Sequence, residues 1–531
     1  MKNFKLYLLL FVSACMLLSC SKDYLDAEPL TELTDSNFYQ TPEDAYSALV
    51  GCYDGMQRAV GGIGGLSYPV ASMVMSDNFY GGGGSADGFG FQAVDEFDIT
   101  RSPADQNLYG GLWDAYYKGV YRCNVLIQKI DQINWEESEN PQLREQYLSE
   151  ARVIRGYLYF QMVKMWGNIP LLTEPSAENI PQATPEEVYS VIAEDLSFAS
   201  ENLPDQAYTA VEPGRITKWA AKSLLARVYL YYTGYYDQQD LAGVVTKAQA
   251  LGHVEDVIAS SGHGLVSDFS TLWPAESLEN FAGENNEEIV FSVKLTYTSD
   301  YNGNTDGNLW MVMLGLREYT YYPYGNGWGV TVNSDIYNAF NTNDTRRDAS
   351  IIGIEEQGVP FDKLANQREY SGYYTKKYTP MSDDAGNSLA VQLGGVDFQI
   401  GQFQDFYVIR YADVLLMAAE LGSPNAQSYL DEVRQRAYKD NFTSVAVTPE
   451  SIQNERRLEL ALEGVRYWDL LRQGIDEAAN TIAKSTTLLN AGAEVQKTIS
   501  ASNIQKTKGL QQIPNNQITL SNGVLIQNEG W

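Results

Sequence analysis

The tripeptide Thr-Pro-Glu occurs at three places in this chain, each time in front of apolar residues at helical spacing. Threonine is a favourable N-cap, and proline fits the first helical position because its missing N–H would have no partner there anyway. An acid in the first turn interacts favourably with the helix dipole. The copies begin at Thr41, Thr184 and Thr448. Each predicts a helix start, and together they indicate helical hairpins.

Apolar residues recur every three or four positions along several stretches, which is the spacing that buries one face of an α-helix. The stripes are Tyr46, Leu49, Tyr53 and Met56; Tyr147, Ala151, Ile154, Leu158, Met162 and Met165; Val188, Ile192, Leu196 and Ala199; Ala220, Leu224, Val228 and Tyr231; Val408, Tyr411, Leu415 and Ala418; Leu430, Val433 and Ala437; and Leu458, Ala461, Val465 and Trp468. We expect a mainly α fold of tetratricopeptide-like hairpins, although no strict repeat of about 34 residues is visible. The last stripe predicts the final strong helix, and beyond Gly474 we expect a tail without periodicity.

The stretch between His263 and Val408 has a different character. It is richer in Gly, Asn, Asp and Tyr, and short segments such as Ile289 to Lys294 alternate in polarity. A chain of 531 residues exceeds the usual size of a single core, so two domains or one helical array with insertions are expected. We predict a helical part over residues 20–262, and over residues 263–531 a part with an irregular, loop-rich insertion, short strands and closing helices.

An aromatic segment, Trp310 to Trp328, lies inside this insertion and is interrupted by glycine and proline, which disfavours a helix. Flat rings on a rigid support can stack on sugar rings, and their polar edges can form hydrogen bonds. The alternative is that the rings only fix the loop to the scaffold. We interpret the segment as a carbohydrate-binding surface, with Trp273 as a further candidate. The candidate rings of the segment are Trp310, Tyr319, Tyr321, Tyr322, Tyr324 and Trp328.

A glycine-rich stretch from Gly61 to Gly90 predicts a second displayed loop, with Asp77, Asn78 and Tyr80 as candidate ligand contacts. A phosphate-binding role is disfavoured, because no Gly-Lys-Ser/Thr arrangement opens a helix after it. The formal net charge of −31 repels polyanions, so nucleic acid is an unfavourable partner and a neutral ligand fits better. The acidity also fits a soluble, self-repelling surface, which we favour over an acidic binding face.

The N-terminus has the layout of an export signal. Lys2 and Lys5 precede an apolar run from Leu6 to Leu18 that is too short for a membrane-spanning helix. The run closes on Leu-Leu-Ser-Cys20, which resembles the lipobox of bacterial lipoproteins, where the cysteine is acylated after removal of residues 1–19. The following Ser-Lys-Asp resembles the tag that sends Bacteroidetes lipoproteins to the outer face of the outer membrane.

The mature chain would keep two thiols, Cys52 and Cys123. Both lie in helical patterns; they could pair, but we favour buried free thiols. The chain has only two histidines, His253 and His263, so neither a catalytic triad nor a three-histidine metal site is readily assembled.

Carboxylate pairs are harder to exclude, since the chain has 68 acidic residues. Glu455, Glu459 and Glu463 are spaced by four and stand near Arg456, Arg457 and Arg466. We favour a network of ion pairs between helices over a catalytic role for them. No cofactor is predicted. A structural calcium ion would have ligands available in loop acids such as Asp300 and Asp306, but the sequence does not assign such a site.

Four runs of residues carry a family resemblance, and they occur in the expected order behind the lipobox. The runs are Glu150 to Phe160 continuing to Trp166-Gly167-Asn168-Ile169-Pro170; Gly214 to Lys218 continuing to Ala226 to Leu230; Arg410 to Val414 with Ala419-Glu420; and Glu455 to Leu460 with Glu463 to Leu470. In these runs the chain resembles the SusD/RagB family of Bacteroidetes outer-membrane lipoproteins. The usual closing Pro-Gly-Tyr is here Glu529-Gly530-Trp531.

The resemblance implies a SusD-like helical scaffold, anchored to the cell surface through a lipid on Cys20. It implies a protein without enzymatic activity that captures a glycan and delivers it to a TonB-dependent transporter of the SusC type. Two alternatives remain, a surface endo-glycosidase and a receptor for peptides of the RagB kind. The family motifs mark scaffold positions, so the ligand-contacting residues proposed above rest on the chemistry of this chain alone.

Overall fold

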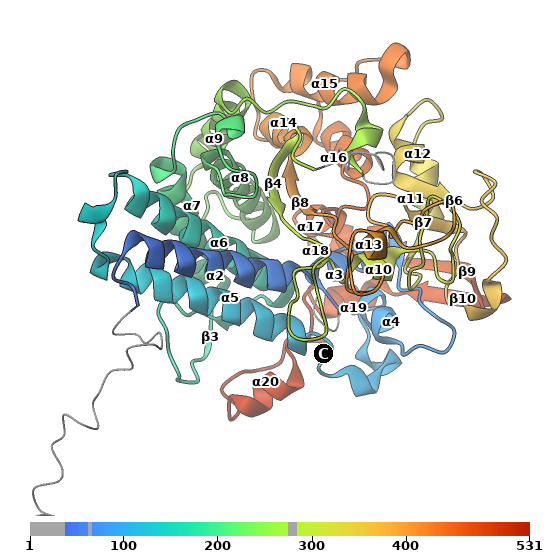
Figure 1. The fold of residues 1–531 in the computed structure, drawn as a ribbon. Helices are drawn as coiled ribbons and strands as arrows, with labels where there is room; N and C mark the ends of the chain where they lie inside the picture. Colours follow the sequence, from blue (N-terminus) through green and yellow to red (C-terminus); the bar gives the residue numbers. More distant parts are fainter. Residues whose placement is uncertain (1–37, 62–65, 274–283) are drawn as a thin grey trace, which may run out of the picture.

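The structure is a computed structural model that describes residues 38–61, 66–273 and 284–531 (Figure 1). The predicted signal segment and Cys20 lie outside the described residues. Within these ranges, no helix combines the length and the apolar character needed to cross a bilayer. The fold is mainly α-helical.

Six long helices form a layered array at the left of Figure 1, in which each helix packs on the next one along the chain. They are α2 (Pro42–Gly61), α5 (Gly110–Lys129), α6 (Leu143–Trp166), α7 (Pro185–Asn202), α8 (Lys218–Tyr235) and α9 (Lys247–Ser260). The apolar stripe from Tyr147 to Met165 on α6 is buried, as its spacing predicts. This arrangement confirms the tetratricopeptide-like hairpins.

The three predicted helix starts are confirmed, and side-chain caps explain them. Thr184 begins α7 with a capping box, in which its hydroxyl accepts from the Glu187 N–H and the Glu187 carboxylate accepts from the Thr184 N–H. Thr448 forms the same box with Ser451 at the start of α16 (Pro449–Glu459). Thr41 accepts a hydrogen bond from the Asp44 N–H at 3.2 Å. Cys52 on α2 and Cys123 on α5 are buried free thiols, which also confirms the favoured interpretation.

The C-terminal helices continue the array. They are α14 (Tyr411–Glu420), α15 (Ala426–Tyr438), α16, α17 (Arg466–Leu471) and α18 (Ile475–Ile482). The prediction of one helix through Leu458 and Trp468 is wrong. The helix α16 ends at Glu459, and the chain turns through Leu462 and Gly464, both at positive φ, before α17 begins. The apolar residues of this stripe recur at helical spacing in the sequence because both short helices pack against the same core.

The strands of the described residues form small two-stranded antiparallel sheets. The pairs are β1 (Phe79–Tyr80) with β5 (Thr331–Val332), β2 (Ile169–Pro170) with β3 (Gln182–Ala183), β4 (Ile289–Val293) with β8 (Phe406–Arg410), β6 (Ile351–Gly353) with β7 (Tyr373–Thr375), and β9 (Lys484–Asn490) with β10 (Ala493–Ile499). The strand β4 confirms the alternation seen from Ile289. The β9–β10 hairpin stands where we expected an irregular tail.

Short helices fill the remaining described chain. They are α3 (Tyr68–Val74), α4 (Gly90–Asp95), α10 (Met311–Leu314), α11 (Ser334–Ala339), α12 (Arg346–Ser350), α13 (Leu389–Gln392), α19 (Ala501–Lys506) and α20 (Asn515–Leu520). One large apolar core runs from the long helices into this region, and a smaller core lies around Tyr374. The loop-rich half, on the right of Figure 1, is therefore continuous with the helical scaffold.

Candidate functional site

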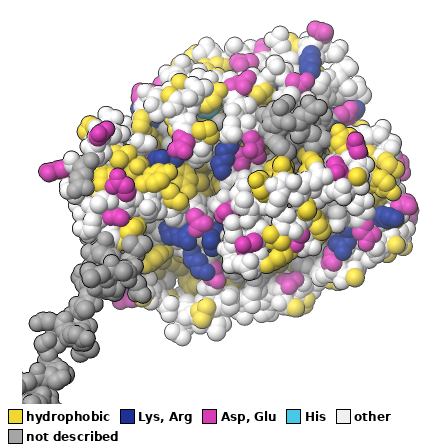
Figure 2. Space-filling view, viewed as in Figure 1, with side chains coloured by type: hydrophobic (Ala, Val, Ile, Leu, Met, Phe, Trp, Pro, Cys, Tyr) yellow, Lys and Arg dark blue, Asp and Glu magenta, His cyan; other side chains and the backbone are white. Residues whose placement is uncertain are grey.

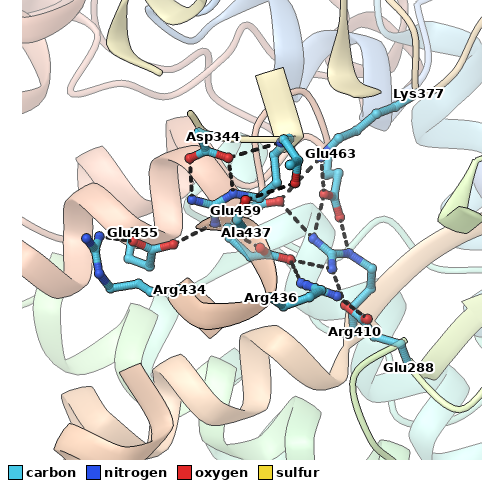
Figure 3. Close-up of polar contacts among 12 residues, drawn as sticks. Glu288, Asp344, Lys377, Arg410, Arg434, Arg436, Ala437, Glu455, Glu459 and Glu463 are labelled. Atoms are coloured by element: carbon cyan, nitrogen blue, oxygen red, sulfur yellow. Dashed lines mark hydrogen bonds and ion pairs between the residues drawn. The ribbon is translucent and has the colours of Figure 1, made fainter. Parts of the chain in front are cut away.

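Buried charges join the helical scaffold to the loop-rich half. Arg410 donates to Glu459 at 2.8 Å and to Glu463 at 2.8 and 2.9 Å, and it also pairs with Glu288 (Figure 3). Arg436 pairs with Glu288 and Glu459 at 2.5 Å each. Although burial acts to raise the pKa of Glu459, the guanidiniums of Arg436, Arg410 and Arg346 hold it well below its ordinary value. The expected ion-pair network is confirmed, but Arg456, Arg457 and Arg466 pair with aspartates instead, and the arginines of the network come from other elements.

This network leaves its carboxylates engaged with cations of the protein. Glu455 accepts from Arg346 at 2.6 Å and from Arg434 at 2.8 Å, and Glu463 accepts from Lys377 at 2.7 Å. A glycosidase needs two carboxyl groups facing a substrate across an open cleft. These carboxylates are buried and held by salt bridges, so they have a structural role.

The structure buries the first ring of the aromatic segment. Trp310 is fully buried, with ring centroids 4.9 Å from Tyr378 and 5.7 Å from Phe406. Trp273 is also fully buried, against Tyr378 and Tyr407. The expectation that these two rings are displayed is wrong. Their indoles supply the apolar area that joins the loop-rich half to the main core.

Two tyrosines of the same segment belong to the small second core. Tyr319 and Tyr324 are buried there with Leu316, Ile352 and Tyr374. Their phenol rings are therefore not available for stacking on a ligand. For these positions the alternative interpretation, in which the rings fix the loop to the scaffold, is correct.

The glycine-rich stretch is not a displayed loop over residues 66–84, which are mostly buried. Tyr80 is buried in β1 opposite Thr331. Asp77 is held by Arg457 and Arg466, each at 2.9 Å, and Asn78 is buried with its carbonyl accepting the Asn333 N–H at 2.8 Å. The expectation that Asp77, Asn78 and Tyr80 are displayed to a ligand is wrong. Ion pairing holds Asp77, strand pairing holds Tyr80, and burial keeps Asn78 away from solvent.

Three rings of the aromatic segment do reach solvent. Tyr321 is 61% exposed, Tyr322 is 53% exposed and Trp328 is 37% exposed. Trp328 is held by a short extended ladder, since its N–H donates to the Val312 carbonyl at 2.7 Å and the next N–H, of Gly329, donates to Gly315 at 2.9 Å. The backbone of Trp328 is therefore held in place, and part of its indole is open to solvent.

Close approach of two glycines makes this ladder possible. A Cβ on Gly327 would lie 2.2 Å from the Cα of Gly315, so a side chain there would push the two backbones apart. The glycines that argue against a helix in the sequence thus have a second role. They bring the chain around Trp328 against α10.

A groove of about 500 Å³ opens beside Trp328, and we call it the Trp328 groove. Its lining is largely apolar and comes from six separate stretches of the chain. The lining residues are Leu66, Gly82, Gly83, Asp87, Gly88, Gly90, Phe91, Leu108, Leu309, Val312, Met313, Trp328, Gln399 and Ile400. Figure 2 shows apolar side chains at the surface over the region of α10 and α13, mixed with polar ones. Tyr321 and Tyr322 are not among the lining residues.

Another part of the groove lining is a glycine turn that contacts Gly329, next to Trp328, and donates its N–H groups to carboxylates. The Gly81 N–H donates to Asp95 at 2.9 Å, and the Gly82 N–H donates to Glu369 at 3.2 Å. Gly82 has a φ of +60°, and a Cβ there would lie 2.2 Å from the Gly329 carbonyl oxygen. Only glycine fits this contact, which joins the turn to the Trp328 ladder.

One lysine of the β9–β10 hairpin holds these carboxylates. Lys497 lies 2.8 Å from Asp95, 2.8 Å from Glu96 and 2.9 Å from Glu369, and all four groups are buried. Burial, with the neighbouring carboxylates Glu369 and Glu96, raises the pKa of Asp95 to about 8, against the opposing effect of Lys497. Lys497 and Arg101, which lies 2.9 Å from Glu96, give two cations for three carboxylates, and burial favours a protonated Asp95 near neutral pH.

Sequence reasoning missed most of the groove. Phe91, the Leu309–Met313 segment and Ile400 stand far apart in the chain, and each looks like ordinary core. Val391 near the end of α13, and Leu393 and Val396 after it, are exposed and lie close in sequence to Gln399 and Ile400. Aliphatic residues in a stretch that also holds Gly394 and Gly395 are the sequence signal that could have drawn attention to this side.

Two further features bear on catalysis and metals. Burial lowers the pKa of both His253 and His263 to about 4. In the described part of the chain, no three or more His, Cys, Asp or Glu side chains gather so as to hold a metal ion. Asp300 instead accepts backbone N–H groups of Asn302 and Asn304, at 2.7 and 3.1 Å.

Comparison with known proteins identifies the family. Residues 281–531 match the model of the SusD family, and residues 66–230 match a model described as starch-binding, associating with outer membrane. The chain belongs to the SusD/RagB family, as the four sequence runs indicate.

The relatives span nearly the whole chain. A SusD-like protein of Bacteroides ovatus is 26% identical over 500 residues, covering 87% of this chain and 81% of the relative. A solved structure titled a laminarin binding SusD-like protein is 28% identical with a TM-score of 0.72, covering 93% of this chain and all (100%) of that one. Surface glycan-binding protein A from Bacteroides fluxus is 25% identical with a TM-score of 0.76 over 93% of this chain and 100% of that one.

Proposed function

We propose that this protein is a surface lipoprotein that binds a neutral polysaccharide or oligosaccharide and delivers it to a SusC-type TonB-dependent transporter. The observation that carries the binding part is the Trp328 groove, a largely apolar hollow with a fixed, half-open indole at its edge. Similar proteins are titled as binding laminarin or surface glycans. Lipid attachment at Cys20, surface exposure and the transporter partner follow from family membership and the lipobox.

The chemistry of the groove suits an uncharged sugar chain. The indole of Trp328 offers a flat apolar face, on which one face of a sugar ring can stack. The charged group in the lining, Asp87, is paired with Arg317 at 3.0 Å and accepts the Gly84 N–H at 2.7 Å, so it is engaged with the protein. With the net charge of −31, this favours a neutral glycan over a uronic or sulfated one.

The exposed Tyr321 and Tyr322 complete the proposal as a second, outer contact. They lie on the same segment as Trp328 but outside the groove lining. A longer glycan leaving the groove would meet them on the surface. We therefore expect Trp328 to contribute more than either tyrosine, since it combines ring stacking with a hollow that excludes water.

Isothermal titration calorimetry against neutral polysaccharides, including laminarin, tests this proposal. Trp328→Ala should weaken binding by roughly 1 to 3 kcal/mol, the range for one stacking ring, which corresponds to about 5- to 150-fold in Kd. Tyr121→Ala is the matched control, because Tyr121 is 55% exposed on α5, a helix with no residue in the groove lining. Unchanged affinity in both Trp328→Ala and a Tyr321→Ala/Tyr322→Ala double variant would remove the site assignment.

The same samples separate the proposal from its two alternatives. New reducing ends after incubation with a bound polysaccharide would identify an endo-glycosidase. Saturable binding of oligopeptides, with every glycan inert, would identify a peptide receptor. We expect glycan binding with no cleavage.

A further inference from the structure

A small cavity lies where α6, α8, β8 and α17 meet, and it has no lining residue in common with the Trp328 groove. We call it the Lys164 cavity. Its volume is about 50 Å³, which is room for one monatomic ion or one to two water molecules, since a water molecule occupies about 30 Å³ in the liquid. The charged residues of its lining are Lys164, Arg227, Arg456, Glu463, Asp469 and Arg472.

Lys164 is buried with its ammonium group among aromatic rings. Only 5% of the residue is exposed, and Nζ lies 4.1 to 5.8 Å from the centroids of four rings, those of Tyr68, Phe160, Tyr231 and Trp468. These contacts favour the charged form, because the face of an aromatic ring attracts a cation. Among the residues that the structure describes, however, Nζ has neither a hydrogen-bond acceptor nor an ion-pair partner.

The donors of Lys164 reach the cavity. Lys164 belongs to the lining, and its Nζ still has accessible surface, whereas the Nε of Arg227 is fully covered. An ammonium group has three N–H donors, and keeping them buried without an acceptor costs free energy. An acceptor inside the cavity removes that cost.

The charges around the cavity balance except for Lys164. Within the described ranges, the guanidiniums of the lining pair with an equal number of carboxylates: Arg227, Arg456 and Arg472 with Asp413, Asp469 and Glu420. The other charged group of the lining, Glu463, belongs to the network of Figure 3, in which described cations and carboxylates are also equal in number. Its members are Arg346, Lys377, Arg410, Arg434 and Arg436 with Glu288, Asp344, Glu455, Glu459 and Glu463. Lys164 has no counter-charge in either set.

A buried lysine without a counter-charge either loses its proton or takes up an anion. Burial, with the nearby Arg227, lowers the pKa of Lys164 well below its ordinary value. An anion in the cavity opposes this shift, because a close opposite charge favours the protonated form. It also gives the three N–H donors an acceptor, which a neutral amine among aromatic rings does not obtain. The small volume restricts the anion to a monatomic one.

We propose that the Lys164 cavity binds one chloride ion, with Lys164 Nζ as its direct donor. The bound ion completes the charge balance of the buried groups around it. The cavity is lined from both the long helix α6 and the strand β8, so the ion stabilises the junction between the helical array and the loop-rich half. This site is independent of the proposed glycan groove.

Crystals of the protein soaked in sodium bromide test the proposal directly. Bromide replaces chloride and is located by its anomalous scattering. We expect an anomalous peak inside the cavity, at hydrogen-bond distance from Lys164 Nζ. A cavity without such a peak, in crystals that show bromide elsewhere on the surface, would overturn the proposal and leave water as the occupant.

Thermal unfolding gives the matching measurement in solution. At constant ionic strength, replacing sodium gluconate by sodium chloride should raise the Tm in a saturable way, because a ligand that binds only the folded state stabilises it. Gluconate is too large for the cavity. Lys164→Met keeps an unbranched apolar side chain and removes the charge, so its Tm should no longer depend on chloride.

Lys222→Met is the control for this series. Lys222 also lies on the long-helix array, in α8, but it pairs with Asp256 and is not part of the cavity lining. Its chloride dependence should equal that of the natural protein. The same chloride dependence in Lys164→Met would place the effect elsewhere and contradict the proposal. If Lys164→Met does not fold, the bromide experiment on the natural protein still decides.

Discussion

The helical and loop-rich halves of the molecule place their aromatic side chains by different rules. On α6, Tyr147 and Tyr157 are buried with the whole apolar stripe, in a helix whose neighbours cover most of its surface. In the loop-rich half, Trp310 is fully buried while Trp328 of the same segment is 37% exposed. A helix fixes where successive side chains point, whereas an irregular segment leaves the direction of each ring to its tertiary contacts.

The strongest test of this comparison breaks the connection between the halves. Arg410→Met should lower the free energy of unfolding by on the order of 5 kcal/mol, because Glu288, Glu459 and Glu463 would be left as buried, poorly compensated charges. Chemical denaturation measures this change. Arg58→Ala is the control, since Arg58 forms an ion pair with Asp54 while its side chain is 39% exposed, and it should change little. If Arg410→Met lowered the free energy of unfolding by less than Arg58→Ala does, the two halves would not depend on the network.

The next test separates the buried ring from the exposed one. Trp310→Ala should cost on the order of 3 kcal/mol of stability, because it opens a cavity against Tyr378 and Phe406. Trp328→Ala should leave stability nearly unchanged and reduce glycan affinity instead. Thermal and chemical unfolding of both variants measure the change in stability, and calorimetry measures the change in glycan affinity. Equal stability losses in the two variants would contradict the division into a core ring and a ligand ring.

The last test concerns the cluster behind the groove, where the expected effect is a dependence of stability on pH and not the loss of a contact. The pKa of Asp95 is raised to about 8 in the fold, mainly by burial, so the folded protein holds a proton that the unfolded chain releases at lower pH. This contribution to stability is present at low pH and is lost as the pH rises from about 4 to 8. The slope is limited to about 1.4 kcal/mol per pH unit for one proton.

Asp95→Asn provides the measurement. The variant keeps an acceptor for the Gly81 N–H and cannot titrate, so its stability should fall less than that of the natural protein between pH 5 and pH 8. Denaturant midpoints at several pH values are compared. Parallel pH profiles for the two proteins would show that Asp95 does not hold the proton.

Much of the scaffold could be predicted from the sequence. The Thr-Pro-Glu starts became helix caps, the stripe on α6 is buried, and the spacing of Glu455, Glu459 and Glu463 predicted an ion-pair network. The caps and the buried stripe depend on residues within a few positions of one another, whereas the arginines of the network come from distant parts of the chain. The β9–β10 hairpin was missed because its strands carry mostly polar residues, and its turn runs through Ala491 and Gly492 at positive φ without the usual Asn-Gly pair.

The candidate site was predicted only in part. The aromatic segment does contain Trp328, Tyr321 and Tyr322 at the surface, but Trp310, Tyr319 and Tyr324 are in cores. The groove walls come from chain segments around residues 66, 82–91, 309–313 and 400. No local pattern indicates that these segments meet.

The sequence by itself determined the helices, their buried faces and the family, because these follow from short-range periodicity and from runs of neighbouring residues. Only the tertiary structure decided which aromatic rings stay in water. Irregular backbone has no period that fixes the direction of a side chain. Contacts such as Trp310 against Tyr378, and the Gly82 turn against the Trp328 ladder, join residues that are distant in the chain, and those contacts choose the exposed ring.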